Sequence, residues 1–119
     1  MLTQPIPEVT DEDVRRVALR DFGTAQLSFV LSVVEEFGRQ NWNQPSPRVR
    51  LAILKMAQGD LGRLRQATQV AIEDYRDALS AAEYPRYMRE IAFSDVPREV
   101  AQKVIDADWR QYREWLDRK

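Results

Sequence analysis

Apolar residues recur along much of this chain at the three- and four-residue spacing of an amphipathic helix. The clearest stretch lies between residues 61 and 83, whose apolar positions are Leu61, Leu64, Ala71, Ile72, Tyr75, Ala78, Leu79 and Ala82. At about 100° per residue these side chains share one face of a helix, and most charged residues fall on the opposite face. The pattern therefore predicts one long helix over residues 61–83, which Pro85 ends.

Capping residues, glycines and prolines mark where the other helices begin and end. We expect these helices over residues 11–22, 24–37, 47–58 and from 94–97 to about 117, with a short helical turn between 87 and 93. The apolar run LSFVLSVV leaves a strand as the alternative, but its spacing and flanking glycines favour a helix. Residues 1–10 contain two prolines and are expected to form an irregular tail over the surface.

The sequence thus predicts an all-α fold, a compact bundle of about five helices in a single domain over residues 1–119. The two short apolar helices, 24–37 and 47–58, are expected inside, with the longer amphipathic helices packed across them. The composition is that of a globular protein, because 44% of the residues are hydrophobic and 31% are charged. A chain of 119 residues can bury a core without disulfides.

The chain contains neither cysteine nor histidine. This removes disulfides, thiolate nucleophiles, histidine-based triads and the common zinc sites from the candidate chemistry. We therefore expect a protein that is not an enzyme and that takes no cofactor or metal. The N-terminal sequence has no basic and apolar leader, and no run approaches the roughly 18 apolar residues of a membrane span. The expected location is the cytoplasm, with no membrane as a partner.

The C-terminal helix contains an acidic residue within its broad apolar arc, at Asp108. A buried carboxylate without a partner is strongly destabilising, so we expect it to meet an arginine, a Tyr or Trp donor, or a helix N-terminus. That arrangement would fix how the helix docks. The alternative is that this helix faces another protein chain, with Trp109, Tyr112 and Trp115 forming an aromatic patch around Asp108.

The segment EDYRDALSAAEY combines carboxylates with aromatic residues. Glu73 and Asp77 fall in the middle of the polar face of the predicted helix, and Glu83 lies on its flank. Asp74 lies at the edge of the apolar arc, so Asp74 and Tyr84 are the binding candidates here. A carboxylate enzyme or metal site around residues 74, 77 and 108 is a weaker interpretation, because helical metal sites usually recruit Glu or His from several helices.

Trp42 stands in the polar loop QNWNQ, where a large aromatic residue needs a reason. It either folds back to cover the core or serves as an exposed binding anchor.

Basic residues dominate the middle of the chain, where residues 37–72 contain Asp60 as the one acidic residue. This basic 39–65 region spans a helix, Gly59 and a second helix start, an order that resembles a DNA-binding helix-turn-helix. Nucleic-acid binding is therefore the alternative function, with contacts expected from Arg48, Arg50, Lys55, Arg63 and Arg65. Against it, Asp60 would repel phosphates at the entering end of the second helix.

The stretch VRLAILKMAQGDLGRLRQATQVAIEDYRDALSAAEYP, followed by IDADWRQYREWL, resembles small bacterial all-helical proteins to which no activity is assigned. The resemblance covers about half of the chain and rests on the Gly-Asp turn, Asp-Tyr-Arg-Asp and the Glu-Tyr-Pro helix end. It implies a bacterial cytoplasmic origin and brings no functional residue with it. The sequence as a whole favours a non-catalytic module that binds a protein partner or a second copy of itself.

Overall fold

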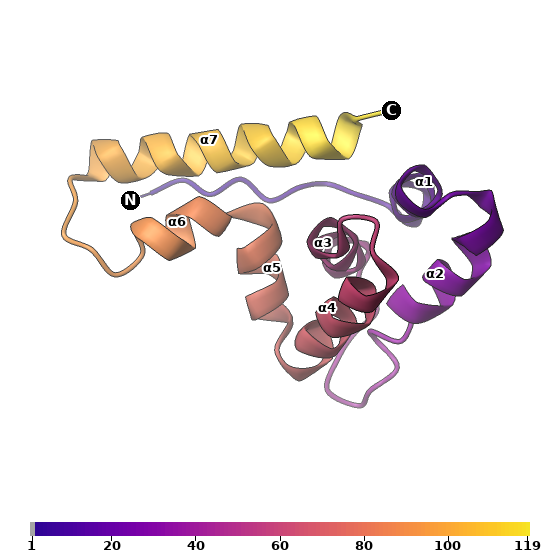
Figure 1. Ribbon diagram of the computed structural model, residues 1–119. Helices are drawn as coiled ribbons and strands as arrows, with labels where there is room; N and C mark the ends of the chain where they lie inside the picture. The colour runs from indigo at the N-terminus through magenta and orange to yellow at the C-terminus, as the bar shows by residue number, and fades with distance from the viewer. Residues whose placement is uncertain (1) are drawn as a thin grey trace.

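The computed structural model describes residues 2–119, and the described residues form helices and connecting loops without a strand (Figure 1). The helices are α1 (Asp11–Phe22), α2 (Leu27–Val34), α3 (Pro47–Ala57), α4 (Leu61–Glu73), α5 (Tyr75–Glu83), α6 (Pro85–Glu90) and α7 (Arg98–Asp117), with a 3₁₀ turn at Thr24–Gln26. The predicted all-α class is confirmed, and the expected number of about five helices is close to the seven α-helices that residues 2–119 form.

Side-chain caps set the helix starts that the sequence predicted. Thr10 and Asp13 form a capping box, in which each side chain accepts a hydrogen bond from the backbone N–H of the other residue. Ser46 accepts from the backbone N–H of Val49, and Pro47 takes the first position of α3, where its missing N–H is not needed. The helices α1 and α3 therefore begin where expected.

The long helix predicted over residues 61–83 is wrong in one respect, because the chain breaks into α4 and α5 at Asp74. The backbone of Asp74 is extended, and its carboxylate accepts a hydrogen bond from the N–H of Arg76. Asp74 thus ends one helix and caps the next. The predicted helix over 24–37 is also shorter than expected, since α2 ends at Val34 and irregular turns follow it.

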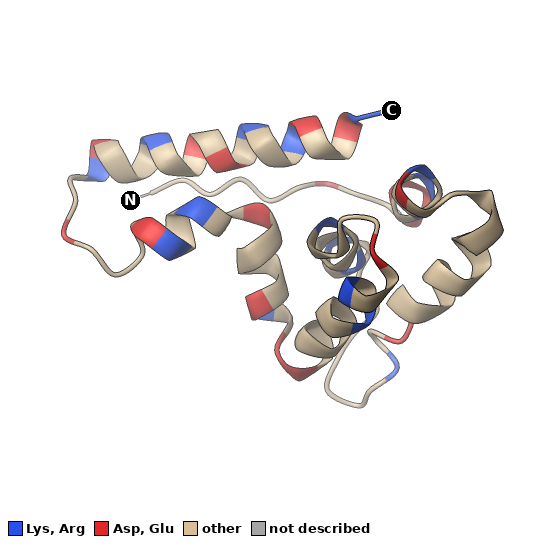
Figure 2. Ribbon diagram, viewed as in Figure 1, with Lys and Arg blue, Asp and Glu red and all other residues tan. Residues whose placement is uncertain are grey.

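The helix α3 forms the centre of the fold, as expected. Its residues Leu51 to Leu54 are fully buried, and α1, α4 and α5 all pack against it. The helix α2 is less central than predicted, because Phe29 remains exposed on its outer side. Figure 2 shows that α2 carries no charged residue, whereas positive and negative residues are interspersed along α7.

The helix α7 lies across α5 and α6, and residues 2–10 run between them in an extended conformation (Figure 1). The N-terminal segment has no regular structure, as predicted, and it follows the surface between α7 and the α5–α6 pair, with residues 3, 4, 6, 8 and 10 exposed. Pro7 is buried there. The molecule is elongated, with principal extents of 47 × 34 × 24 Å.

Candidate functional site

Two exposed aromatic side chains flank a cleft between the loop 38–46 and α5. Trp42 is 69% exposed and Tyr75 is 45% exposed, although both belong to the residue types that proteins most often bury or use at interfaces. The cleft has a volume of about 320 Å³. Its lining residues are Phe37, Trp42, Asn43, Gln44, Ser46, Arg48, Val49, Tyr75 and Leu79.

The position of Trp42 follows from the helix break at Asp74. In a continuous helix the N–H of Arg76 would bond to the carbonyl of Ile72, but here it bonds to the Asp74 carboxylate. The freed Ile72 carbonyl instead accepts the indole N–H of Trp42 and the side-chain amide of Asn43, both at 3.0 Å. The loop is therefore fastened to the end of α4, and the ring of Trp42 is held outward.

The turn that starts this loop is tightly packed. Gly38 has a φ of 103°, and a Cβ atom at this position would lie 2.7 Å from the Cα atom of Pro45. A side chain here is excluded by both the backbone conformation and the contact. The two ends of the loop thus meet closely, which gives the cleft a fixed wall.

The cleft floor combines apolar surface with one arginine. The buried side chains Phe37 and Val49 form its apolar part. Arg48 holds Glu83 through two hydrogen bonds, from Nε at 2.8 Å and Nη2 at 2.6 Å. Glu83 is 1% exposed, and its hydrogen bonds raise the pKa of Arg48. The pair therefore presents a cationic group at the cleft while satisfying a buried carboxylate.

Asp74 has a structural role at the edge of this site. Its carboxylate accepts hydrogen bonds from the Arg76 guanidinium at 3.0 Å as well as from the Arg76 backbone. These hydrogen bonds lower the pKa of Asp74. The carboxylate is a helix cap with its own cation rather than a free ligand group.

Asp108 is 5% exposed, and of the three kinds of partner expected for it the structure shows a helix N-terminus. Its two oxygens accept the backbone N–H groups of Tyr87 at 2.9 Å and Arg86 at 3.4 Å, both in the first turn of α6. Tyr84, the residue just before α6, makes no side-chain hydrogen bond that caps this helix. Asp108 therefore caps α6 from the neighbouring helix, which compensates its burial and fixes how α7 docks.

The aromatic patch considered for α7 is not on the surface. Tyr112 and Trp115 are core residues, and Trp109 is half-buried against the core. The rings of Tyr112 and Trp115 lie 5.5 Å apart and fill the space between α7 and the remaining helices. Tyr84 is likewise buried, and its hydroxyl donates to the carbonyl of Pro5.

Three of the five cations proposed for nucleic acid make part-buried hydrogen bonds within the fold. Arg48 pairs with Glu83, as described above. Arg50 donates to the carbonyl of Phe37, and Lys55 donates to the carbonyl of Ala82 and to Gln111. Burial lowers the pKa of Lys55.

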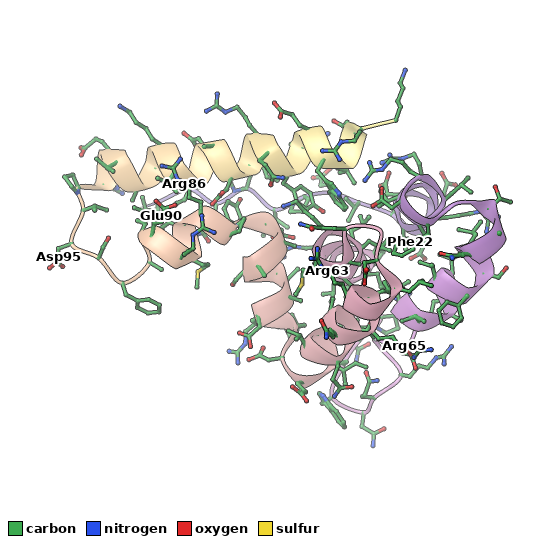
Figure 3. All side chains as sticks on the ribbon, in the orientation of Figure 1. Phe22, Arg63, Arg65, Arg86, Glu90 and Asp95 are labelled. Atoms are coloured by element: carbon green, nitrogen blue, oxygen red, sulfur yellow. The ribbon has the colours of Figure 1, made fainter. Side chains whose placement is uncertain are left out.

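The other two cations are directed to different neighbours. Figure 3 labels Arg63 and Arg65 on α4. Arg63 donates to Gln58 at the end of α3, whereas Arg65 lies over the ring of Phe29 on α2. They therefore do not present one continuous basic face.

Sequence reasoning found Trp42 and missed Tyr75, which it had assigned to the buried arc of a continuous helix. The cap formed by Asp74 rotates α5 away from the register of α4. The sequence signal for this break is an Asp followed by helix-favouring residues, which is typical of a helix start. Sequence reasoning also missed Phe93, whose side chain is 95% exposed in the connection between α6 and α7.

Within residues 2–119, no three acidic side chains are grouped so that they could hold a metal ion, and no helix there could cross a membrane. No family model matches the chain, and neither the curated proteins nor the solved structures contain a match.

Proposed function

We propose that this protein is a non-catalytic protein-binding module that holds a short segment of a partner in the cleft between Trp42 and Tyr75. The observation that supports this most is an exposed tryptophan held in place by a main-chain hydrogen bond. Fixing an aromatic ring before binding reduces the entropy lost on binding. Exposed Trp, Tyr and Arg side chains around a small apolar floor are also the composition of binding hot spots.

The cleft suits an apolar side chain of a peptide better than a reaction. Its volume of about 320 Å³ is at the low end for small-molecule pockets. No carboxylate lines the cleft among the described residues, and Glu83, behind the lining residue Arg48, is already bound by it through two hydrogen bonds. A carboxylate bound in this way is poorly placed to accept a proton from a substrate.

Selection from a library of displayed random peptides tests this proposal. The full chain is the bait, and enriched peptides are then titrated against the wild type and Trp42→Ala. We expect peptides with an apolar anchor residue, whose affinity falls at least tenfold in Trp42→Ala. Phe29→Ala is the matched control, because it removes another exposed aromatic ring on α2. Peptides that bind both variants as well as the wild type would refute the cleft as the site.

Self-association is a second candidate, supported by the exposed apolar side chains near the connection of α6 to α7. These are Met88, Phe93, Val96 and Val100. Arg86 and Glu90, which Figure 3 labels on α6, pair with each other and so place a neutralised polar pair on the same short helix. Sedimentation analysis over a range of concentrations should show a dimer that Phe93→Ser weakens. A wild type that stays monomeric at the highest concentration would exclude it.

Nucleic-acid binding through the basic 39–65 region remains the alternative, with Arg63 and Arg65 as its most available cations. Binding of this kind weakens steeply with salt because counterions are released. A gel-shift titration with mixed DNA and RNA at low salt tests it. A salt-sensitive shift that Arg63→Gln reduces would favour this alternative over the peptide cleft.

A further inference from the structure

Residues 2–8, here called the strap, lie between α7 and the α5–α6 pair (Figure 1). The strap contacts Gln102 on α7 and Tyr84 between α5 and α6, and we call the surface that it covers the groove. The groove wall on α7 contains Gln102. Its side-chain carbonyl accepts the N–H of Thr3 at 2.9 Å, and its side-chain N–H₂ donates to the carbonyl of Thr3 at 3.0 Å. Asp106 accepts a further hydrogen bond from the same N–H₂ group, which orients the amide. One side chain thus satisfies both main-chain groups of a residue in the strap.

The opposite wall makes a second main-chain contact. The hydroxyl of Tyr84, at the junction of α5 and α6, donates to the carbonyl of Pro5. Pro7 is buried, whereas the side chains on either side of it, Ile6 and Glu8, are exposed. Side chains of an extended chain alternate between two faces, and Pro5, two residues before the buried Pro7, is half-buried on the same side.

The groove therefore recognises an extended backbone more than a particular sequence. Within the described residues, each side-chain hydrogen bond to residues 2–8 ends on a main-chain atom. Sequence preference comes from the buried position, where a proline is pre-set to the extended conformation and loses little entropy. Such contacts are the same for any segment with a compatible backbone and a proline at the buried position.

We propose that this groove is a second peptide-binding site, whose ligand is an extended, proline-containing segment, and that the strap occupies it as an internal competitor. A partner segment of the same chemistry replaces the strap residue by residue, because it offers the same main-chain donor and acceptors. This inference does not depend on the Trp42 cleft, which is lined by other residues.

Competition by the strap determines how binding should behave. A tethered segment acts at an effective concentration of roughly millimolar for short linkers. An external peptide with the same contacts must exceed that concentration, so the wild type should bind it weakly. Weakening the strap within the intact chain should therefore strengthen binding of the external peptide.

The experiment uses the full chain and the free peptide LTQPIPEVT, which copies residues 2–10. Pro7→Asp places a charge at the buried strap position, and Ile6→Ser is the matched strap control at an exposed one. Binding of labelled peptide is followed by fluorescence anisotropy, and the amide signals of Gln102 are followed by NMR. We expect at least tenfold tighter binding by Pro7→Asp than by the wild type or Ile6→Ser. Adding Gln102→Ala to Pro7→Asp should remove that gain.

A second variant that weakens the strap less covers the case in which Pro7→Asp does not fold. Thr3→Pro removes the donor to Gln102 while leaving the buried proline in place, and circular dichroism reports whether each variant is folded. If Pro7→Asp and Thr3→Pro both fold without binding the peptide, or if both unfold, the strap is part of the core and the proposal is overturned. Trp42→Ala should leave this binding unchanged, which separates it from the cleft. A wild-type dimer that the peptide dissociates also supports the groove, with a second copy supplying the segment.

Discussion

Glu83 lies in an environment that its position in the sequence does not indicate. On the helical wheel it lies on the polar flank, yet it is among the most deeply buried side chains of the protein. The difference arises because α3 brings Arg48 against it and the core closes over the pair. Helical periodicity describes one helix in isolation, and it cannot show which neighbour will cover a flank.

Glu83→Gln tests the contribution of this pair to stability. The substitution leaves the Arg48 guanidinium in a half-buried site without its carboxylate, and loss of one partner of a buried pair costs about 3 kcal/mol or more. We expect a decrease of this order in the free energy of unfolding, measured by urea denaturation. The double variant Arg48→Met with Glu83→Leu should recover much of the loss, because it removes both charges together. If the free energy of unfolding of Glu83→Gln stays within about 1 kcal/mol of the wild type, instead of falling by ~3 kcal/mol, the pair does not have this role.

Tyr84 should make the fold sensitive to alkaline pH. Burial, with the nearby negative charge of Glu83, raises the pKa of Tyr84 from its ordinary value of 10.0 to about 12. Between pH 10 and 12 the folded state therefore retains this proton while the unfolded state loses it. The stability that Tyr84 contributes is fully present below pH 10 and is lost as the pH rises from 10 to 12. Urea denaturation along this pH range should show a smaller fall in Tyr84→Phe. Burial lowers the pKa of Lys55, so the contribution of Lys55 to stability changes with pH in the opposite direction. Both the wild type and Tyr84→Phe contain Lys55, so its contribution cancels when the two are compared.

At the scale of elements, the sequence predicted most of the helices and missed one break. The apolar positions of α4 and α5 continue in a single arc, so periodicity alone gives one helix over residues 61–83. A capping side chain can interrupt such an arc, because it satisfies the N–H groups that a continuous helix would bond internally. The same break creates the cleft, which explains why Trp42 could be selected from the sequence and its partner Tyr75 could not.

Asp74→Ala tests whether this cap keeps the two helices apart. The substitution removes the acceptor for the Arg76 N–H and should lower stability, because the start of α5 loses its cap. The Arg76 N–H then becomes free to bond to the Ile72 carbonyl and to displace the indole of Trp42. We expect a shift of the tryptophan emission together with the loss of stability, both followed during denaturation. Asp77→Ala, at an exposed position of α5, is the control. An unchanged emission spectrum would show that the loop does not depend on the break.

Asp108→Asn tests the cap that joins α6 to α7. The neutral amide retains the shape but exchanges one acceptor oxygen for a donor, which faces the N–H groups of α6. Loss of a buried charged acceptor costs about 1–3 kcal/mol. Hydrogen exchange of the Arg86 and Tyr87 amides should accelerate in the variant. Asp95→Asn, an exposed residue in the connection before α7, should leave both stability and exchange unchanged.

The whole molecule combines a central part, formed by α1 to α5 around α3, with an arm formed by α6, the connection to α7 and the first half of α7. The sequence predicted the central position of α3 because that helix is apolar on two sides. It singled out Asp108 as a docking residue, but it could not show that the partner is the N-terminus of α6 or that residues 2–8 bond to the side chains of Gln102 and Tyr84. Those contacts join residues that are distant in sequence and carry no periodic signal.

This division predicts unequal stability across the fold. The amides of α3 lie among fully buried side chains, so they should exchange only when the whole protein unfolds. The arm has several exposed apolar side chains and few buried ones, so its amides should exchange through local opening at a lower free energy. Native-state hydrogen exchange at increasing urea measures both. The arm amides should be nearly insensitive to urea at low concentrations, whereas those of α3 should follow global unfolding. Identical free energies in both parts would show instead that the groove, the strap and the core open as one cooperative unit.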